Sequence, residues 1–140
     1  MAERMNNLTG KEWLQNSFSI WRDIRKSSEE LALKHPAMYP SQLCERLIDI
    51  YSRDDGEVIL DPFLGVGSTL VAAKNRLKRG IGIELNPEYA DLARMRVSDS
   101  PTSPSYSDGV EKSFFEQEIF DGDSMNILSQ IDNVTVDLCI

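Results

Sequence analysis

The sequence predicts an α/β domain with a Rossmann-like parallel sheet, and two consecutive patterns carry this prediction. The stretch Val58-Ile-Leu-Asp-Pro-Phe-Leu-Gly-Val-Gly-Ser-Thr69 has the pattern of a buried strand, a glycine loop and the start of a helix. The stretch Gly80-Ile-Gly-Ile-Glu-Leu-Asn-Pro87 has the pattern of a second strand that ends on an acid, 23 residues after Asp61. Strands that alternate with helices are typical of a parallel sheet covered on both faces. A polar ligand is expected in the crevice beyond the strand ends of such a unit.

Length and composition indicate one globular domain without a membrane segment. The chain has 140 residues, of which 41% are hydrophobic and 27% charged. No apolar run approaches the roughly 20 residues of a membrane span, and the N-terminus lacks the apolar core of a signal peptide, so we expect a cytoplasmic protein without a membrane partner. Cys44 and Cys139 lie in apolar patterns without metal-ligand spacing, which favours buried free thiols and no metal site.

The net charge of −8 is concentrated at one end of the sequence. Residues 99–140 contain nine acidic residues and one basic residue, whereas the basic and acidic residues balance in 1–52 and in 53–98. A nucleic-acid-binding surface is expected to be basic. The one basic cluster, at positions 74–79, is typical of a solvated helix end. These 140 residues alone are therefore not expected to bind DNA strongly.

The domain is expected to divide into N-terminal helices over 1–52 and β-α-β units over 53–140, without internal repeats. Apolar spacing predicts a helix over 11–34, in which Trp13 and Trp21 belong to a packing stripe. Ser41 is expected to cap a helix that ends near residue 51. The further expected elements are a helix over 69–77, a strand over 81–83, a helix capped by Asn86 that runs to 97, a surface loop over 98–108, a strand over 114–120, a helix over 125–131 and a strand over 134–140.

The residues at the expected strand ends suit a nucleoside that carries a cation. Gly65-Val-Gly67 lets backbone approach a ligand, but Leu70 stands where a dinucleotide fingerprint needs a third glycine. Asp61 would repel a pyrophosphate and suits an ammonium group. Glu84 suits a ribose diol, and Asp123 an exocyclic amine of adenine. Ammonium, ribose and adenine together describe S-adenosylmethionine better than NAD.

Each of these acids also has a purely structural interpretation. Asp61 could begin a turn before a proline, Glu84 could cap the next helix, and Asp123 could be the N-cap of the helix that follows it. His35, which precedes a proline, is interpreted as structural rather than as a general base.

Four segments resemble motifs of the DNA amino-methyltransferases, which methylate adenine N6 or cytosine N4. Asp61-Pro-Phe-Leu-Gly-Val-Gly-Ser-Thr69 is similar to their motif I, and His35-Pro-Ala-Met-Tyr-Pro40 is similar to motif X. Gly82-Ile-Glu84 with Asn86-Pro-Glu-Tyr89 resembles motif II, and Asp121-Gly-Asp-Ser124 resembles motif III.

This resemblance implies a Rossmann-like S-adenosylmethionine-dependent methyltransferase fold with a partial parallel sheet. It is dense over residues 20–97 and looser over 115–140. The cofactor-binding residues that it implies are Pro36, Ala37, Met38, Asp61, Pro62, Phe63, Gly65, Gly67, Thr69, Glu84, Asn86 and Asp123. By this resemblance the glycine-loop residues line the methionine end, residues 36–38 close over it, Glu84 holds the ribose and Asp123 the adenine.

The family's catalytic motif, Ser/Asp/Asn-Pro-Pro-Tyr/Phe, has no counterpart in the sequence. Val136-Asp-Leu-Cys-Ile140 resembles the strand that leads into it. Ser103-Pro-Ser-Tyr106 differs from it at the second proline and lies in a Ser/Pro-rich loop. We therefore assign no catalytic residue and expect a fragment of a site-specific, restriction-modification DNA methyltransferase that is inactive alone.

Two alternatives are compatible with the same residues. The chain could be the cofactor-binding subunit of a split methyltransferase, in which case a second subunit supplies the acceptor site and the last strand has an apolar exposed edge. It could instead be a non-catalytic S-adenosylmethionine-binding remnant. DNA and a cognate restriction endonuclease are the other partners that the resemblance implies.

Overall fold

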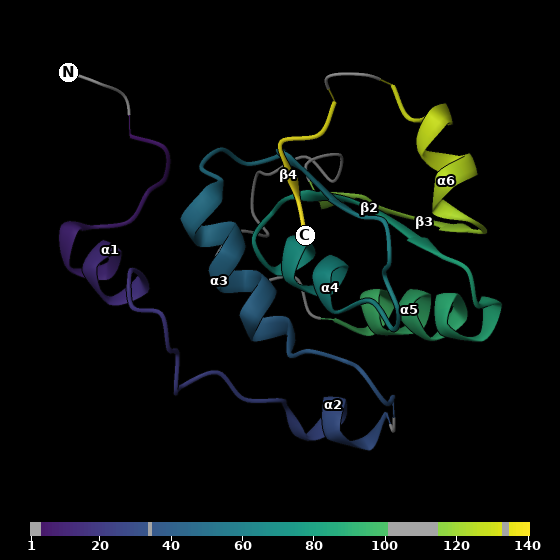
Figure 1. Cartoon of the computed structure of the whole chain (residues 1–140), viewed down its shortest axis with the longest axis horizontal. Coiled ribbons are helices and arrows are strands. Elements are labelled where there is room, and N and C mark those ends of the chain that lie inside the picture. The colour runs from purple at the N-terminus through teal and green to yellow at the C-terminus, as the bar shows by residue number, and fades with distance from the viewer. Residues whose placement is uncertain (1–3, 34, 101–114, 133–134) are drawn as a thin grey trace.

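The computed structural model describes residues 4–33, 35–100, 115–132 and 135–140, and it contains a four-stranded sheet (Figure 1). The strands are β1 (Val58–Asp61), β2 (Arg79–Glu84), β3 (Gln117–Asp121) and β4 (Leu138–Cys139). Their order in the sheet is β3-β2-β1-β4, and all three pairings are parallel. The predicted α/β class and parallel sheet are confirmed.

Helices cover one face of the sheet, and a short helix lies on the other side (Figure 1). The covering helices are α3 (Ser41–Tyr51), α4 (Ser68–Asn75) and α5 (Pro87–Asp99), and the short one is α6 (Ser124–Ile127), followed by the 3-10 turn η3 (Leu128–Gln130). Among the described residues, helices lie on both faces of the sheet, as expected, but one face is covered by three helices and the other only by the short α6 and η3.

The buried core lies between the sheet and the three covering helices. One cluster joins α3, β1 and α4 through Cys44, Ile48, Ile59, Ala72 and Ala73. A second cluster joins the glycine loop, α4 and α5 through Leu64, Leu70 and Ala93. The small alanines let the helices approach closely, and burial of such apolar side chains is the main stabilising contribution to a fold of this size.

The prediction of a single helix over 11–34 is wrong. The described residues form α1 (Gly10–Asn16) and α2 (Ser28–Ala32), with non-helical backbone between them. Each begins with a capping box, in which Thr9 pairs with Glu12 and Ser27 pairs with Glu30. A capping box satisfies the first backbone N–H groups of a helix, which have no partner within the helix. A second capping box inside the amphipathic pattern therefore starts a second helix, and the segment forms two short helices.

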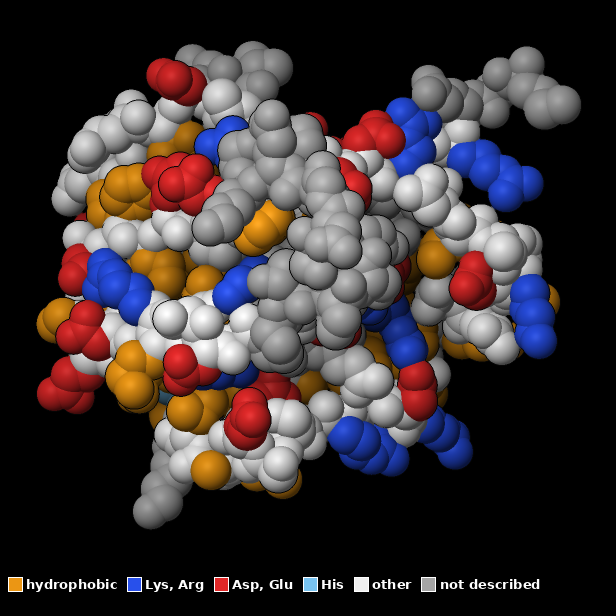
Figure 2. All heavy atoms as spheres, turned by 180° about the vertical axis from the view of Figure 1, so that it is seen from behind, with side chains coloured by type: hydrophobic (Ala, Val, Ile, Leu, Met, Phe, Trp, Pro, Cys, Tyr) orange, Lys and Arg blue, Asp and Glu red, His pale blue; other side chains and the backbone are white. Residues whose placement is uncertain are grey.

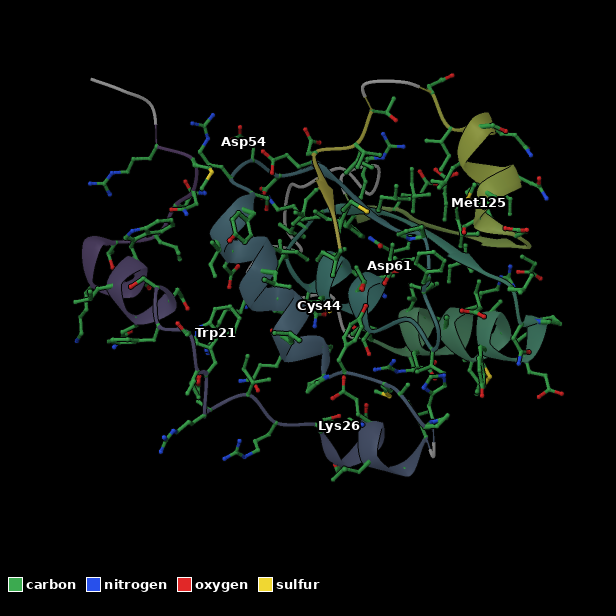
Figure 3. The ribbon with its side chains drawn as sticks, in the orientation of Figure 1. Trp21, Lys26, Cys44, Asp54, Asp61 and Met125 are labelled. Atoms are coloured by element: carbon green, nitrogen blue, oxygen red, sulfur yellow. The ribbon has the colours of Figure 1, made fainter. Side chains whose placement is uncertain are left out.

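The tryptophans do not form the expected packing stripe. Trp13 is exposed on α1, as is Leu14 beside it. Trp21 lies in the connection between α1 and α2, next to α3 in Figure 3, with the Arg46 guanidinium 5.2 Å from its ring centroid. The N-terminal segment is therefore attached to the domain partly through a cation–π contact.

Several element boundaries differ from those expected. Pro40 rather than Ser41 is the N-cap of α3, whereas Asn86 caps α5 as predicted. Strand β2 begins earlier than expected, β3 and β4 begin later, and α4 ends at Asn75. In the loop expected over 98–108, residues 98 and 99 continue α5, and residues 101–108 lie outside the described residues. The segment 103–106, which differs from the family's catalytic motif at the second proline, also lies outside the described residues.

Among the described residues, no helix combines the length and apolarity that crossing a membrane requires.

Gly67→Ala is expected to lower the free energy of unfolding by about 1–3 kcal/mol, because the backbone there is in the left-handed region and leaves no room for a side chain. Gly67 has φ +88°, and an added Cβ would lie 2.9 Å from Cβ of Ala93. Urea unfolding measures the change. Gly10→Ala is the control, because nothing lies within 4 Å of its added Cβ. Equal losses in the two variants would contradict the assignment.

Candidate functional site

The loop after β1, the end of β2, the segment 35–39 and the start of α5 line an open cavity of about 310 Å³. Parallel strands place their carboxyl ends at one edge of the sheet, where the connecting loops form a crevice. The cavity is lined by His35, Ala37, Met38, Tyr39, Phe63, Leu64, Gly65, Val66, Ser68, Glu84 and Tyr89. Segments that resemble three different sequence motifs thus form one site.

The glycine loop is held against the end of β2 by backbone hydrogen bonds. The Leu64 amide donates to the Ile83 carbonyl at 2.9 Å, and the Gly65 amide donates to Glu84 Oε2 at 2.7 Å. The Gly67 amide donates back to the Leu64 carbonyl at 3.1 Å. The loop conformation is therefore fixed by the strand end that it faces.

Glu84 has both carboxylate oxygens oriented by backbone donors. Oε2 accepts from the Gly65 amide, and Oε1 accepts from the Asn86 amide at 2.8 Å. A carboxylate offers about four lone-pair sites, so two sites are left for a ligand. Asn86 in turn accepts from the Glu88 amide at the start of α5. Glu84 thus holds the N-cap residue of α5 rather than capping the helix itself, and it lines the cavity.

Asp61 lies behind the cavity wall and has a relative exposure of 2%. Its Oδ2 accepts from the hydroxyls of Thr69 at 2.5 Å and Tyr39 at 3.0 Å, and its Oδ1 accepts from the Phe63 amide at 3.0 Å. Figure 3 shows Asp61 on the side of the sheet that faces Cys44 of α3. This carboxylate therefore ties residues 35–40 to the glycine loop.

Burial has the largest effect on the pKa of Asp61. Burial raises the pKa of Asp61, the hydrogen bonds from Thr69, Phe63 and Tyr39 oppose it, and the nearby Glu84 charge adds to the rise, so that the net pKa is above the ordinary value. Burial also raises the pKa of Tyr39, and it raises the pKa of Cys44 to about 12. Cys44 is an inert buried thiol, as expected, whereas Cys139 is exposed, because β4 lies at an edge of the sheet.

His35 joins the N-terminal wall of the cavity to α5. Its ring meets Tyr89 edge-on, with the centroids 4.5 Å apart. Its Nδ1 accepts from the Ala37 amide at 3.3 Å, which gives the turn at residues 35–37 a local hydrogen bond. These contacts are those of a structural histidine that also lines the cavity.

Large apolar side chains are exposed just beyond three strand ends. Phe63, Leu85 and Met125 are 80%, 72% and 79% exposed. They follow β1, β2 and the turn after β3, and Met125 projects from α6 (Figure 3). Exposed apolar groups around a polar crevice are typical of ligand sites. Leu85 and Met125 were missed from the sequence, where each stands close to an acid already assigned to the site.

The structure gives the expected site residues different positions relative to the cavity. Ala37, Met38, Phe63, Gly65 and Glu84 line the cavity, while Asp61, Gly67 and Thr69 support it from behind. Asp123 does not line the cavity and is the N-cap of α6, where its Oδ1 accepts from the Met125 amide at 2.9 Å, and the adjacent Gly122 amide donates to the Glu84 carbonyl. Pro36 and Pro62 fix the backbone beside lining residues. The sequence missed Tyr39 and Tyr89, which line the cavity.

The basic side chains at positions 74–79 make contacts within the fold. Their partners are the carbonyl oxygens of Val97, Ser100 and Asp54 and the carboxylates of Asp49 and Glu118. Figure 2 shows Lys and Arg scattered among Asp and Glu on one face, without a broad basic patch. The weak DNA binding expected of these residues stays a prediction.

Comparison with known proteins gives consistent similarities. Residues 2–95 match the DNA methylase family. The chain is 46% identical to the type II methyltransferase M.ScaI of Streptomyces caespitosus over 89 residues, which are 59% of the chain and 29% of that protein. It is 32% identical to M.BglII of Bacillus subtilis over 102 residues, 71% of the chain and 28% of that protein. The chain thus spans less than a third of the length of these relatives.

Solved structures show the same fold. A Thermus thermophilus protein described as a DNA modification methylase, in complex with S-adenosyl-L-methionine, superposes with a TM-score of 0.57 at 32% identity, over 82% of the chain and 39% of that protein. An RNA methyltransferase of Salinibacter ruber superposes with a TM-score of 0.54 at 20% identity, over 74% of the chain and 58% of that protein, a likeness that concerns the fold alone.

Asp61→Asn is expected to change the pH dependence of the free energy of unfolding. Because the pKa of Asp61 is raised above 3.8 in the folded state, the folded chain binds this proton more tightly than the unfolded chain. The stability of the wild type relative to the variant should therefore rise as the pH falls through the folded pKa, and be lost as the pH rises through it. Urea unfolding at a series of pH values measures this difference.

Asp54→Asn is the matched control with the opposite sign. The hydrogen bond from Arg53 lowers the pKa of Asp54, so the wild type should lose stability relative to this variant as the pH falls. A pH-independent difference for Asp61→Asn would contradict a raised pKa at Asp61.

Proposed function

The chain belongs to the DNA methylase family of N6 and N4 amino-methyltransferases, and from this we propose that its residues form the S-adenosylmethionine-binding part of a DNA methyltransferase. The observation that carries the proposal is the cavity at the strand ends, where Glu84 is fixed by two amides beside the glycine loop. The substrate proposed for the whole enzyme is an exocyclic amine in DNA, adenine N6 or cytosine N4.

The donors and acceptors around the cavity fit this cofactor. Glu84 has lone pairs free to accept from both ribose hydroxyls, and its orientation is set before the ligand arrives. Just beyond the cavity lining, we assign the exposed side chains of Leu85 and Met125 to apolar contact with the adenine ring, and Asp123 to its exocyclic amine. The adenosine half is thus assigned to the ends of β2 and β3.

The methionine half is assigned to the glycine loop and residues 36–39. Helix α4 begins at Ser68, and its N-cap Gly67 provides no side-chain cap, so the positive end of the helix dipole favours a carboxylate. Asp61 is too deeply buried for an open contact with an ammonium group. We propose that it acts through Tyr39, Thr69 and the Phe63 amide, which it holds in place.

S-adenosylmethionine supplies an electrophilic methyl group on a sulfonium centre. The part of this chain is to bind and orient the methyl donor, which accelerates transfer by fixing the approach of the reacting atoms. We assign the exposed ring of Phe63, which lines the cavity, to contact with the cationic part of the ligand. The 140 residues contain no adjacent prolines. We therefore expect no methyl transfer by these residues alone and assign the acceptor site to other parts of the enzyme or to a second subunit.

Glu84→Gln is expected to weaken S-adenosylmethionine binding about tenfold or more, because one amide donor would then face a backbone N–H or a ribose hydroxyl. Isothermal titration calorimetry of the 140-residue chain measures the Kd. Glu118→Gln, on the exposed surface of β3, is the control and should leave the Kd unchanged. Failure of the wild-type chain to bind the cofactor would overturn the proposal.

Phe63→Ala is expected to weaken S-adenosylmethionine binding about three- to tenfold through loss of a cation–π contact, with little change in stability because the ring is exposed. The loss should be smaller for S-adenosylhomocysteine, whose sulfur is uncharged. Phe18→Ala is the control, because it removes an exposed aromatic ring of the N-terminal segment that does not line the cavity. Equal losses for the two ligands would argue against contact with the cation.

A further inference from the structure

A buried ion pair lies behind the proposed cofactor cavity and joins its two walls. Glu30 of α2 and Arg96 of α5 are 66 positions apart in the sequence, and their charged groups meet at 3.2 Å. Both side chains are largely buried. Neither residue lies in the segments that resemble cofactor motifs.

Arg96 contacts the glycine loop. One guanidinium nitrogen donates to the Val66 carbonyl at 2.6 Å and to the Ser68 hydroxyl at 3.3 Å, on the two sides of Gly67. The other nitrogen donates to Glu30. The planar guanidinium can reach both directions at once, which a lysine cannot do. Val66 and Ser68 also line the cavity, so Arg96 fixes this wall from behind.

Glu30 contacts the end of the opposite wall. Its Oε1 accepts from the Ser41 amide at 2.8 Å, at the start of α3, and its Oε2 accepts from the Ser27 amide at 2.9 Å. Ser41 follows Pro40 directly, and four of the five residues before that proline line the cavity, namely His35, Ala37, Met38 and Tyr39. Glu30 therefore anchors the C-terminal end of the wall formed by residues 35–39.

Glu30 and Arg96 are both charged, and each compensates the buried charge of the other. Burial raises the pKa of Glu30, but hydrogen bonds from the Ser41 and Ser27 amides and the Arg96 charge outweigh burial, so the net pKa is lowered and Glu30 is ionised at neutral pH. Removal of either partner leaves the other charge buried and uncompensated. The Val66 carbonyl would also lose its charged donor.

We propose that Glu30 and Arg96 are positioning residues that set the separation of the two walls of the methionine subsite. This inference rests on the proposed function, because it concerns the same cavity. Both walls that the pair joins belong to the methionine half, whereas the adenosine half is assigned to Glu84, Leu85, Asp123 and Met125. The pair should therefore govern affinity for the complete cofactor and not for its adenosine part.

The test compares two probes, S-adenosylmethionine and adenosine, on folded variants of the 140-residue chain. Arg96→Met is expected to raise the Kd for S-adenosylmethionine about tenfold or more, and to change the Kd for adenosine less than twofold. Glu30→Gln should act in the same direction, and the double variant should bind no more weakly than Arg96→Met, since both act through one contact. Calorimetry and an NMR titration measure the two ligands.

Arg46→Met is the matched control. Arg46 lies on α3 and pairs with Asp23, so its loss also breaks an ion pair of the N-terminal segment but touches neither wall of the cavity. It should leave both Kd values unchanged, even if urea unfolding shows lower stability. Arg96→Lys keeps the charge and is the milder variant if Arg96→Met does not fold. It should give an intermediate loss of S-adenosylmethionine affinity.

Two results would overturn the inference. An unchanged Kd for S-adenosylmethionine in Arg96→Lys and Glu30→Gln would show that the pair does not set the subsite. A parallel loss of both ligands would show a general structural role. A wild-type chain that binds neither probe would instead refute the proposed function, so the two failures are distinguishable.

Discussion

The hydrogen bond from the Gly65 amide to the Glu84 carboxylate is the contact on which the rest of the site depends. It joins the loop after β1 to the end of β2, so that the two strand ends act as one rigid edge. With the Leu64 amide bound to Ile83, the loop has little freedom to choose another path. The cavity, the start of α4 and the acceptor assigned to a ribose all follow from this junction.

A second level of organisation lies beneath the cavity, where polar groups are buried to hold backbone in place. Asp61 and Glu30 are both buried carboxylates, yet their environments move their pKa values in opposite directions. Glu30 meets an arginine and two backbone amides, whereas Asp61 meets two hydroxyls and one amide and has Glu84 nearby. Burial of a carboxylate costs free energy unless its hydrogen bonds are complete. Such costs are typical of sites that need precise geometry more than stability.

The β1-loop-β2 unit and its acids could be predicted from sequence because their signals are local. Apolar runs, glycines and a terminal acid lie within 27 residues, and the structure keeps them in contact. The prediction of one N-terminal helix was wrong because it relied on amphipathic spacing and did not use the two capping boxes at which separate helices begin. The pair of Glu30 and Arg96 could not be predicted, since each alone is an ordinary charge on a helix and only the tertiary fold brings them together. The assigned roles in cofactor binding stay predictions.

The strand order also implies an order of assembly. Strand β1 pairs with β2 across a connection of about 20 residues, while its other neighbour, β4, comes from nearly 80 residues further along the chain. Closing a longer loop costs more entropy, and non-local pairing slows folding. We therefore expect β1, α4 and β2 to form the folding nucleus, with β4 added late. The glycine loop would then be set early, before the strand on the other side of β1 has docked.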